Sequence, residues 1–241
     1  MTQGFFMKKL IAFDLDGTLT QHKSPLGEKN RIVLEKLAKR YHLLMLGAGS
    51  CERIFRQMQE FPIEIIGNYG MQHSKIENGS FKIIESLSIP VDRDFVENAV
   101  TSLRKEFGLE KFYGNNVEFH DSGVITFPIL GTAAPLAEKL AYDPDRKKRR
   151  VFYPRVCEIF HDYNVFIGGS SSFDITRGEF NKFFALSKFC RENGYTLDEA
   201  VYFGDDFGEG GNDSHVKLGG VDCIEINDFS EFASKAAVLL D

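Results

Sequence analysis

The stretch LIAFDLDGTLT at residues 10–20 constrains the fold of this chain more than any other segment. Its first part, Leu10–Phe13, is a continuous apolar run, as expected for a strand that is buried on both faces. Asp14 and Asp16 follow this run, and a Gly-Thr pair then allows a tight turn. Ligands bind at the carboxyl ends of the strands in open α/β sheets. The segment therefore predicts a parallel sheet with two acidic side chains at its ligand-binding edge.

Two carboxylates so close together repel each other unless a cation or a shared proton relieves them. The pair suits Mg²⁺ binding combined with covalent phosphoryl transfer, in which one carboxylate attacks phosphorus and the other moves protons. The alternative is an acidic turn without chemistry. The buried strand before the pair and the Gly-Thr-Leu-Thr after it favour the phosphoryl-transfer site over the acidic turn.

Charge and composition exclude several classes of function. The net charge of −6 argues against a nucleic-acid partner. No apolar stretch is long enough to span a membrane, and the N-terminal apolar run continues into the strand before Asp14, so we expect no export signal. The four cysteines form no C-x-x-C pair, which is typical of reduced thiols in a cytoplasmic protein.

The order of predicted elements indicates a core with an insertion. Strands and helices alternate from residue 8 to about 85, and Asn78-Gly79 predicts a type I′ hairpin turn. After Pro90 the pattern becomes helix, two strands, helix, two strands, which predicts a helix-backed antiparallel sheet. We therefore expect a Rossmann-like α/β core at 1–87 and 179–241, with an α+β cap at 88–178. The predicted elements of the second half are a helix at 91–107, strands at 117–120 and 124–129, a helix from Asp143-Pro144 to about 161, strands at 163–167 and 172–176, a helix from about 180, a strand at 200–203 and a helix at 231–240.

A second acidic strand end lies in VYFGDDFGEGGNDSH, residues 201–215. Hard oxygen ligands there could complete a Mg²⁺ site begun by Asp14, with Asp205 as a ligand and Asp213 as a second acid. An acidic, glycine-rich turn is the alternative. Ser50, before a predicted helix, could hold a phosphate oxygen or simply cap the helix. The basic run RKKRR at 146–150 predicts a solvated helix face rather than a polyphosphate patch.

The strand ending in D-x-D-G-T resembles the first motif of the haloacid dehalogenase (HAD) superfamily. This resemblance implies Asp14 as the nucleophile and Asp16 as the general acid/base, with Mg²⁺ bound by Asp14, the Asp16 backbone carbonyl, Asp205 and Asp213. It favours phosphate contact by Ser50, and we also expect contact from the turn that follows the two acids. Lys182 is implied as the lysine of the third motif, with Lys188 as its rival. The turn residues in question are Gly17 and Thr18.

Three further motifs resemble eukaryotic-type phosphomannomutases over nearly the whole chain. They are GNNVEF at 114–119, IGGSSSFD at 167–174 and GGND at 210–213. The resemblance implies sugar-phosphate chemistry, sugar contacts from Ser172 and Asp174, and a homodimer formed through the cap. Because alternate strand residues share a face, Phe173 and Ile175 should pack on the cap helices.

At three positions where the cap of that family carries arginines for a distal phosphate, this chain has other residues. Those positions are His120, Thr132 and Lys139, although Arg104, Arg146 or Arg155 could compensate. A mutase must retain a bisphosphate, and neither lysine nor threonine grips phosphate bidentately. The sequence thus predicts a Mg²⁺-dependent phosphatase for small sugar phosphates, with His120 and Lys139 as substrate contacts. A phosphomutase and a non-catalytic sugar-phosphate sensor are the alternatives.

Overall fold

The computed structural model describes residues 8–240 and divides into two compact units. The core unit comprises the described residues up to Ser86, Asn181–Gly208 and the residues from Asp213. The cap unit comprises Leu87–Phe180 and Glu209–Asn212. The segment Glu209–Asn212 lies outside the insertion expected at 88–178. It joins the cap unit because the Gly210 carbonyl accepts a hydrogen bond from the Ile167 N–H (2.8 Å). Within the described residues, no helix combines the length and apolarity needed to cross a membrane.

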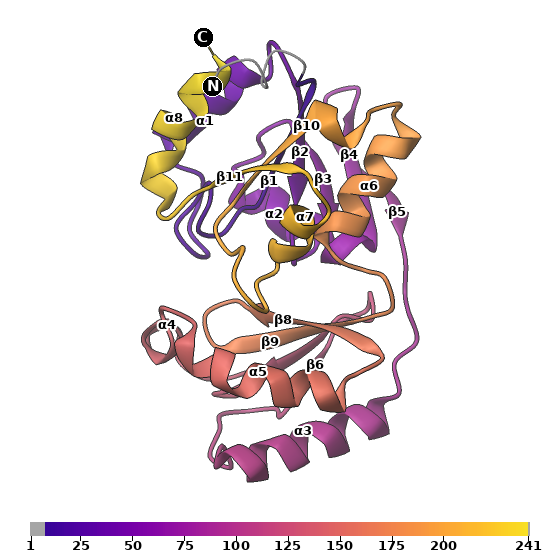
Figure 1. Ribbon diagram of the computed structural model, residues 1–241, viewed down its shortest axis with the longest axis vertical. Coiled ribbons are helices and arrows are strands. Elements are labelled where there is room, and N and C mark those ends of the chain that lie inside the picture. Colours follow the sequence, from indigo (N-terminus) through magenta and orange to yellow (C-terminus); the bar gives the residue numbers. More distant parts are fainter. Residues whose placement is uncertain (1–7, 241) are drawn as a thin grey trace. The chain divides into compact units, whose positions relative to one another are not determined.

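The core unit is built on a seven-stranded sheet in the order β11-β10-β1-β2-β3-β4-β5 (Figure 1). The pairs from β11 to β3 are parallel, and β4 and β5 add an antiparallel hairpin. Because β1 lies between β2 and β10, segments far apart in sequence end side by side at one edge of the sheet. The strands are β1 (Leu10–Phe13), β2 (His42–Leu46), β3 (Glu64–Gly67), β4 (Gln72–Glu77), β5 (Ser80–Ser86), β10 (Ala200–Gly204) and β11 (Asp222–Glu225).

Helices cover both faces of the core sheet, so β1 is fully buried, as its unbroken apolar run predicts. Ile11 and Phe13 pack with α1, α2 and α8, whereas Leu10 and Ala12 pack with α6 and α7. These helices are α1 (Glu28–Leu37), α2 (Cys51–Gln57), α6 (Lys182–Glu192), α7 (Ser214–Leu218) and α8 (Phe232–Lys235).

The hairpin between β4 and β5 confirms the turn predicted at Asn78-Gly79. Both residues have positive φ, 53° for Asn78 and 75° for Gly79, which is the requirement of a type I′ turn.

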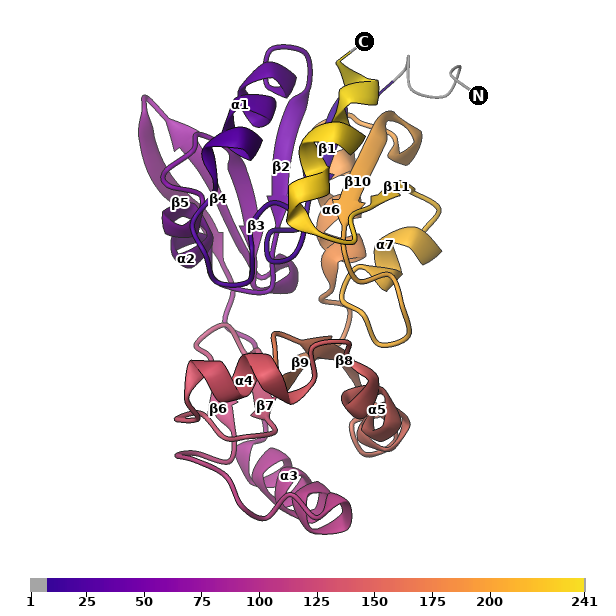
Figure 2. The same cartoon turned by 90° about the vertical axis from the view of Figure 1, so that its left-hand side faces the viewer.

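The cap unit is a four-stranded antiparallel sheet in the order β6-β7-β9-β8, covered on one face by α3 and α5 (Figure 2). Phe173 and Ile175 lie in the cluster that these helices cover, as predicted. Gly108 ends α3 in the left-handed conformation (φ 68°), also as predicted. The elements are α3 (Arg93–Phe107), β6 (Glu118–Phe119), β7 (Ile125–Pro128), α4 (Leu136–Tyr142), α5 (Lys147–Ile159), β8 (Tyr163–Gly168) and β9 (Ser172–Arg177).

Several short elements differ from the sequence prediction. Helices α4 and α7 and strand β11 were not expected, and the predicted helix at 231–240 is α8 flanked by 3₁₀ turns at Phe229–Glu231 and Ala236–Leu239. Helix α4 contributes no buried residue, so its sequence carries little core-facing periodicity. Helix α5 begins at Lys147 rather than at Pro144, because the Asp143 carboxylate accepts hydrogen bonds from the N–H groups of Lys148 and Arg149.

The basic run at 146–150 is not a uniformly solvated face, which corrects the expectation from sequence. The Arg149 side chain is 1% exposed, and its Nε donates to Asp143 Oδ2 (2.8 Å). Its Nη1 donates to the carbonyl oxygens of Gly168 (2.6 Å) and Ser172 (3.0 Å). Arg149 thus satisfies carbonyl groups at the β8–β9 turn and ties that turn to the start of α5.

Removing one partner of a buried ion pair leaves an uncompensated charge, so Arg149→Ala should lower the free energy of unfolding by about 3–5 kcal/mol. Lys147→Ala is the control, because the Lys147 side chain is 80% exposed, and it should change stability by about 0.5 kcal/mol or less. Urea denaturation measures both. Equal effects of the two substitutions would contradict the structural role given to Arg149.

Candidate active site

The loop after β1 holds Asp14 at the carboxyl edge of the core sheet. The Asp14 N–H donates to the Phe203 carbonyl (2.8 Å), which extends the pairing of β1 with β10 by one residue. The chain then turns through Gly17 (φ 98°), and the N–H groups of Thr18 and Leu19 both donate to the Leu15 carbonyl. This compact turn fixes the Asp14 carboxylate at the strand end.

The Asp14 carboxylate is buried and bonded to a buried lysine. Lys182 Nζ lies 2.5 Å from Asp14 Oδ1, and the Thr18 hydroxyl donates to Asp14 Oδ2 (3.5 Å). Lys188, the rival from sequence, pairs with Glu85 instead (2.6 Å). Of the two candidate lysines, Lys182 is therefore the one that contacts the predicted nucleophile. The Thr18 side chain is fully buried against Asp14, so any phosphate contact there would come from its backbone.

Lys182 is the first residue of α6, where Asn181 caps the helix by accepting from the Phe184 N–H (2.8 Å). A cation at a helix N-terminus is opposed by the helix dipole. Burial would also lower the pKa of Lys182, but the carboxylates of Asp14 and Asp213 raise it above its usual value. The lysine is therefore held charged between two acids.

Asp213 accepts hydrogen bonds at both of its carboxylate oxygens. Lys182 Nζ (2.7 Å) and Tyr202 Oη (2.5 Å) donate to Oδ1, and the N–H groups of Asp205 (3.0 Å) and Asp206 (3.1 Å) donate to Oδ2. A carboxylate offers about four lone-pair sites, so these donors occupy the sites that a metal ion would use. Asp213 thus supports Lys182 and the loop after β10.

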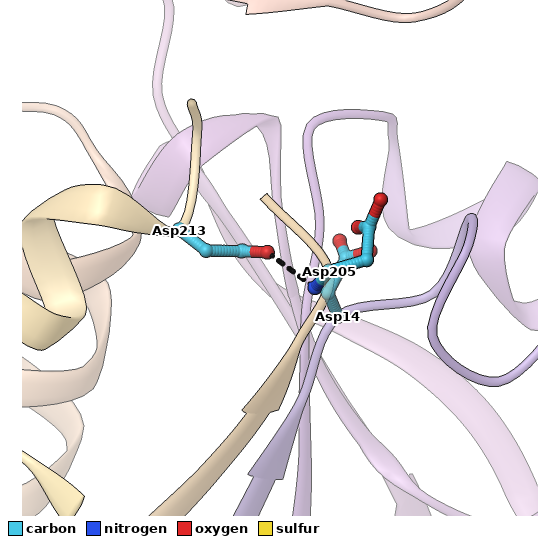
Figure 3. A group of neighbouring side chains, drawn as sticks. All are labelled: Asp14, Asp205 and Asp213. Carbon is cyan, nitrogen blue, oxygen red and sulfur yellow. Dashed lines mark hydrogen bonds between the residues drawn. The ribbon is translucent and has the colours of Figure 1, made fainter. Parts of the chain in front are cut away.

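Asp205 brings a second carboxylate next to Asp14 (Figure 3). A Cβ atom at Gly17 would lie 2.6 Å from Asp205 Oδ2, so only glycine lets the two loops approach this closely. Asp14, Asp205 and Asp213 each offer an oxygen within 4.8 Å of the others.

This acid cluster fits a hard divalent cation. Burial and the nearby carboxylates of Asp213 and Asp205 raise the pKa of Asp14 well above its usual value, against the opposing effect of Lys182. A single lysine thus does not balance the charges, and an all-oxygen donor set is the kind that Mg²⁺ prefers. Because Asp213 already accepts four hydrogen bonds, Asp14 and Asp205 are the side chains with more oxygen lone pairs left for the ion. The metal contact predicted for Asp213, directly or through water, stays a prediction.

The Asp16 side chain has other partners. Its Oδ1 accepts from the Lys23 N–H (2.7 Å) and from Gln57 Nε2 (2.7 Å), and Arg53 lies 3.5 Å from Oδ2. Burial acts to raise the pKa of Asp16, but His22 and these donors outweigh it, so the pKa lies below its usual value. Asp16 is therefore an ionised carboxylate, separate from the three-acid cluster. The predicted metal contact through its backbone carbonyl stays a prediction.

Ser50 is the N-cap of α2 and accepts from the Arg53 N–H (3.3 Å). It follows β2, the strand beside β1, so it lies at the same edge of the sheet as Asp14. The capping role is therefore present, and phosphate contact stays a prediction.

The predicted substrate residues of the cap unit form hydrogen bonds within that unit. His120 Nε2 lies 3.1 Å from Thr126 Oγ1, which in turn donates to Asp174 Oδ1 (3.2 Å). Ser172 Oγ donates to the Gly168 carbonyl (3.0 Å). Thr126 on β7 thus links His120, which follows β6, to Asp174 on β9.

The positions without arginine are used for bonds inside the cap unit. Lys139 Nζ donates to the Thr132 carbonyl (2.9 Å), and Thr132 Oγ1 accepts from the Asn115 N–H (2.8 Å). Of the arginines that could compensate, Arg104 is buried and donates to the Ile129 carbonyl (2.8 Å), and Arg155 pairs with Glu106 (3.0 Å).

Sequence reasoning missed Tyr202, which completes the bonds to Asp213. The available signal was a single phenol in the otherwise apolar strand β10, since a buried tyrosine hydroxyl normally needs a partner.

Comparison with known families identifies the family of this chain. A family model described as eukaryotic phosphomannomutase matches residues 31–219. The chain belongs to the eukaryotic phosphomannomutase family. A phosphomannomutase from Encephalitozoon cuniculi is 26% identical over 221 residues, which cover 87% of this chain and 84% of the relative.

Solved structures show the same fold at low identity. An IMP-nucleotidase from Plasmodium falciparum matches with a TM-score of 0.69 and 14% identity, over 97% of this chain and 68% of that one. A HAD-superfamily phosphatase from Bacteroides thetaiotaomicron matches with a TM-score of 0.62 and 15% identity, over 99% and 96%. The phosphomannomutase family member described here is thus a phosphoryl-transfer enzyme with the HAD fold.

Helix α6 offers a matched test of the buried ion cluster. Lys182→Met leaves Asp14 and Asp213 without their shared cation, so it should cost about 3 kcal/mol or more of unfolding free energy in metal-free buffer. Lys188→Met breaks a half-exposed pair on the same helix and should cost about 1 kcal/mol or less. Denaturant titration of both variants measures this. A cost for Lys182→Met no larger than that for Lys188→Met would show that the cluster does not depend on its lysine.

Proposed function

We propose that this protein is a Mg²⁺-dependent phosphatase that hydrolyses small sugar phosphates through an aspartyl-phosphate on Asp14. The observation that carries the proposal is the buried Asp14–Lys182 pair at the end of β1. The Asp205 carboxylate lies beside Asp14 (Figure 3). A carboxylate held this rigidly at the ligand-binding edge of the sheet suits in-line attack on phosphorus.

In the first step, Asp14 attacks phosphorus, and the bond between phosphorus and the sugar oxygen breaks. Asp16 supplies the proton that the leaving oxygen needs; an incoming phosphate dianion would raise its lowered pKa by like-charge repulsion. In the second step, water attacks phosphorus while Asp16 accepts the water's proton, and the bond between phosphorus and the Asp14 oxygen breaks, which releases inorganic phosphate and restores Asp14. Bound Mg²⁺ would offset charge on the transferred phosphoryl group. Lys182 and, through its hydroxyl, Ser50 would bind that group's oxygens.

The cap residues support water rather than a second sugar as the acceptor. A phosphomutase must hold a bisphosphate by its distal phosphate, and guanidinium groups do this bidentately. His120, Thr132 and Lys139 offer no guanidinium, and each is engaged in a hydrogen bond inside the cap unit. Family membership favours the second candidate, a phosphomutase, because the related proteins carry that name.

We expect Asp14→Asn to abolish turnover while the protein stays folded, because the nucleophile is lost and repulsion with Asp205 is relieved. Wild-type activity should also vanish when EDTA removes divalent ions and return with Mg²⁺. Phosphate release measures turnover, and a circular dichroism melt measures whether the variant is folded. A residual rate for Asp14→Asn above about a hundredth of wild type would refute the nucleophile assignment.

A product assay tests whether water or a sugar accepts the phosphoryl group. The protein is incubated with mannose 1-phosphate and a hexose 1,6-bisphosphate, and both free phosphate and hexose 6-phosphate are followed. We expect free phosphate to dominate. In the triple variant His120→Arg, Thr132→Arg and Lys139→Arg, the hexose 6-phosphate share should rise, because a distal phosphate gains bidentate partners. Efficient isomerisation by the wild type would overturn the phosphatase in favour of the phosphomutase. Binding without either product would favour a sensor.

A further inference from the structure

Tyr202 is the only hydroxyl-bearing side chain of β10, and it is completely buried. Its ring meets Phe207 edge-on, with the centroids 6.1 Å apart, and lies in the apolar cluster under α6 and α7. The backbone makes room for it, since a Cβ atom at Gly204 would lie 2.8 Å from Tyr202 Cε1 and 2.6 Å from Asp213 Oδ2. A phenol is therefore held rigidly beside the Asp213 carboxylate.

Tyr202 and Lys182 donate to the same oxygen atom. Tyr202 Oη lies 2.5 Å and Lys182 Nζ 2.7 Å from Asp213 Oδ1, and Lys182 Nζ lies 2.5 Å from Asp14 Oδ1. The lysine is thus shared between two buried carboxylates that compete for it. The phenol satisfies part of the demand of Asp213, and this leaves the ammonium close to Asp14.

We propose that Tyr202 is a positioning residue that keeps Lys182 on Asp14. When the hydroxyl is removed, Lys182 is the remaining donor to Asp213 Oδ1 among the described contacts. The ammonium then shifts toward Asp213. Asp14 then loses the bond that orients its carboxylate and offsets charge during transfer. The consequence for turnover rests on the proposed function, whereas the shift of Lys182 does not.

The kinetic test uses Tyr202→Phe, which removes one oxygen atom and keeps the ring. We expect kcat for phosphate release to fall about tenfold with KM unchanged, because a buried phenol that acts through Lys182 does not touch substrate. Tyr195→Phe is the control. It removes a core hydroxyl of the same unit that hydrogen-bonds His42 Nδ1 (3.1 Å), and it should leave kcat unchanged.

A double-mutant cycle separates positioning from simple loss of packing. In an Asp213→Asn background, Tyr202→Phe should lower kcat no further, because the atom through which it acts is already changed. A structural role would lower kcat by the same factor in both backgrounds. That result, or a wild-type kcat for Tyr202→Phe alone, would overturn the proposal.

A crystal structure of Tyr202→Phe provides a readout that needs no turnover. We expect the separation between Lys182 Nζ and Asp14 Oδ1 to exceed hydrogen-bond distance, about 3.5 Å. An unchanged separation would overturn the positioning role. If the wild type hydrolyses no sugar phosphate, the proposed function fails, and this structural comparison still decides the role of Tyr202.

Discussion

The candidate active site depends on one interaction, the sharing of the Lys182 ammonium between the carboxylates of Asp14 and Asp213. It joins the end of β1, the first turn of α6 and the loop after β10, which are separated by long stretches of sequence. Each of these charges loses hydration on burial, and only the close contacts compensate for that loss. The parallel order of the sheet makes the contacts possible, because β1 lies between β2 and β10.

The same burial explains why the acid cluster fits a second cation. Three acids cluster where one lysine pairs with two of them, and the pKa of Asp14 is raised well above its usual value by burial and by its acidic neighbours. A divalent ion on Asp14 and Asp205 would keep Asp14 ionised and nucleophilic. Asp16 has a different setting, in which His22 and the donors from Gln57 and Lys23 favour its charged form and lower its pKa. Two acids two residues apart can thus take different roles.

The sequence predicted those parts of the structure that local physics determines. The apolar run of β1, the Asn78-Gly79 turn and the Gly108 helix end are strong local signals, and all three are confirmed. Helix α4 was missed because it buries no residue and so lacks core-facing periodicity. Strand β11 and the burial of Arg149 were missed because they depend on tertiary contacts that no local pattern encodes. In the site, strand-end acids were visible in the sequence. The saturation of Asp213 was not, because it requires Tyr202 and two backbone groups brought together by folding.

The central claim is that phosphate is transferred to Asp14, and trapping the phosphoenzyme tests it most directly. Wild-type protein is mixed with Mg²⁺ and a ³²P-labelled sugar phosphate, quenched in acid within the first turnover and digested for mass spectrometry. The account predicts an acid-stable, hydroxylamine-sensitive label on the peptide that contains Asp14, as expected of an acyl phosphate. Release of phosphate at the full rate with no label on that peptide would contradict it.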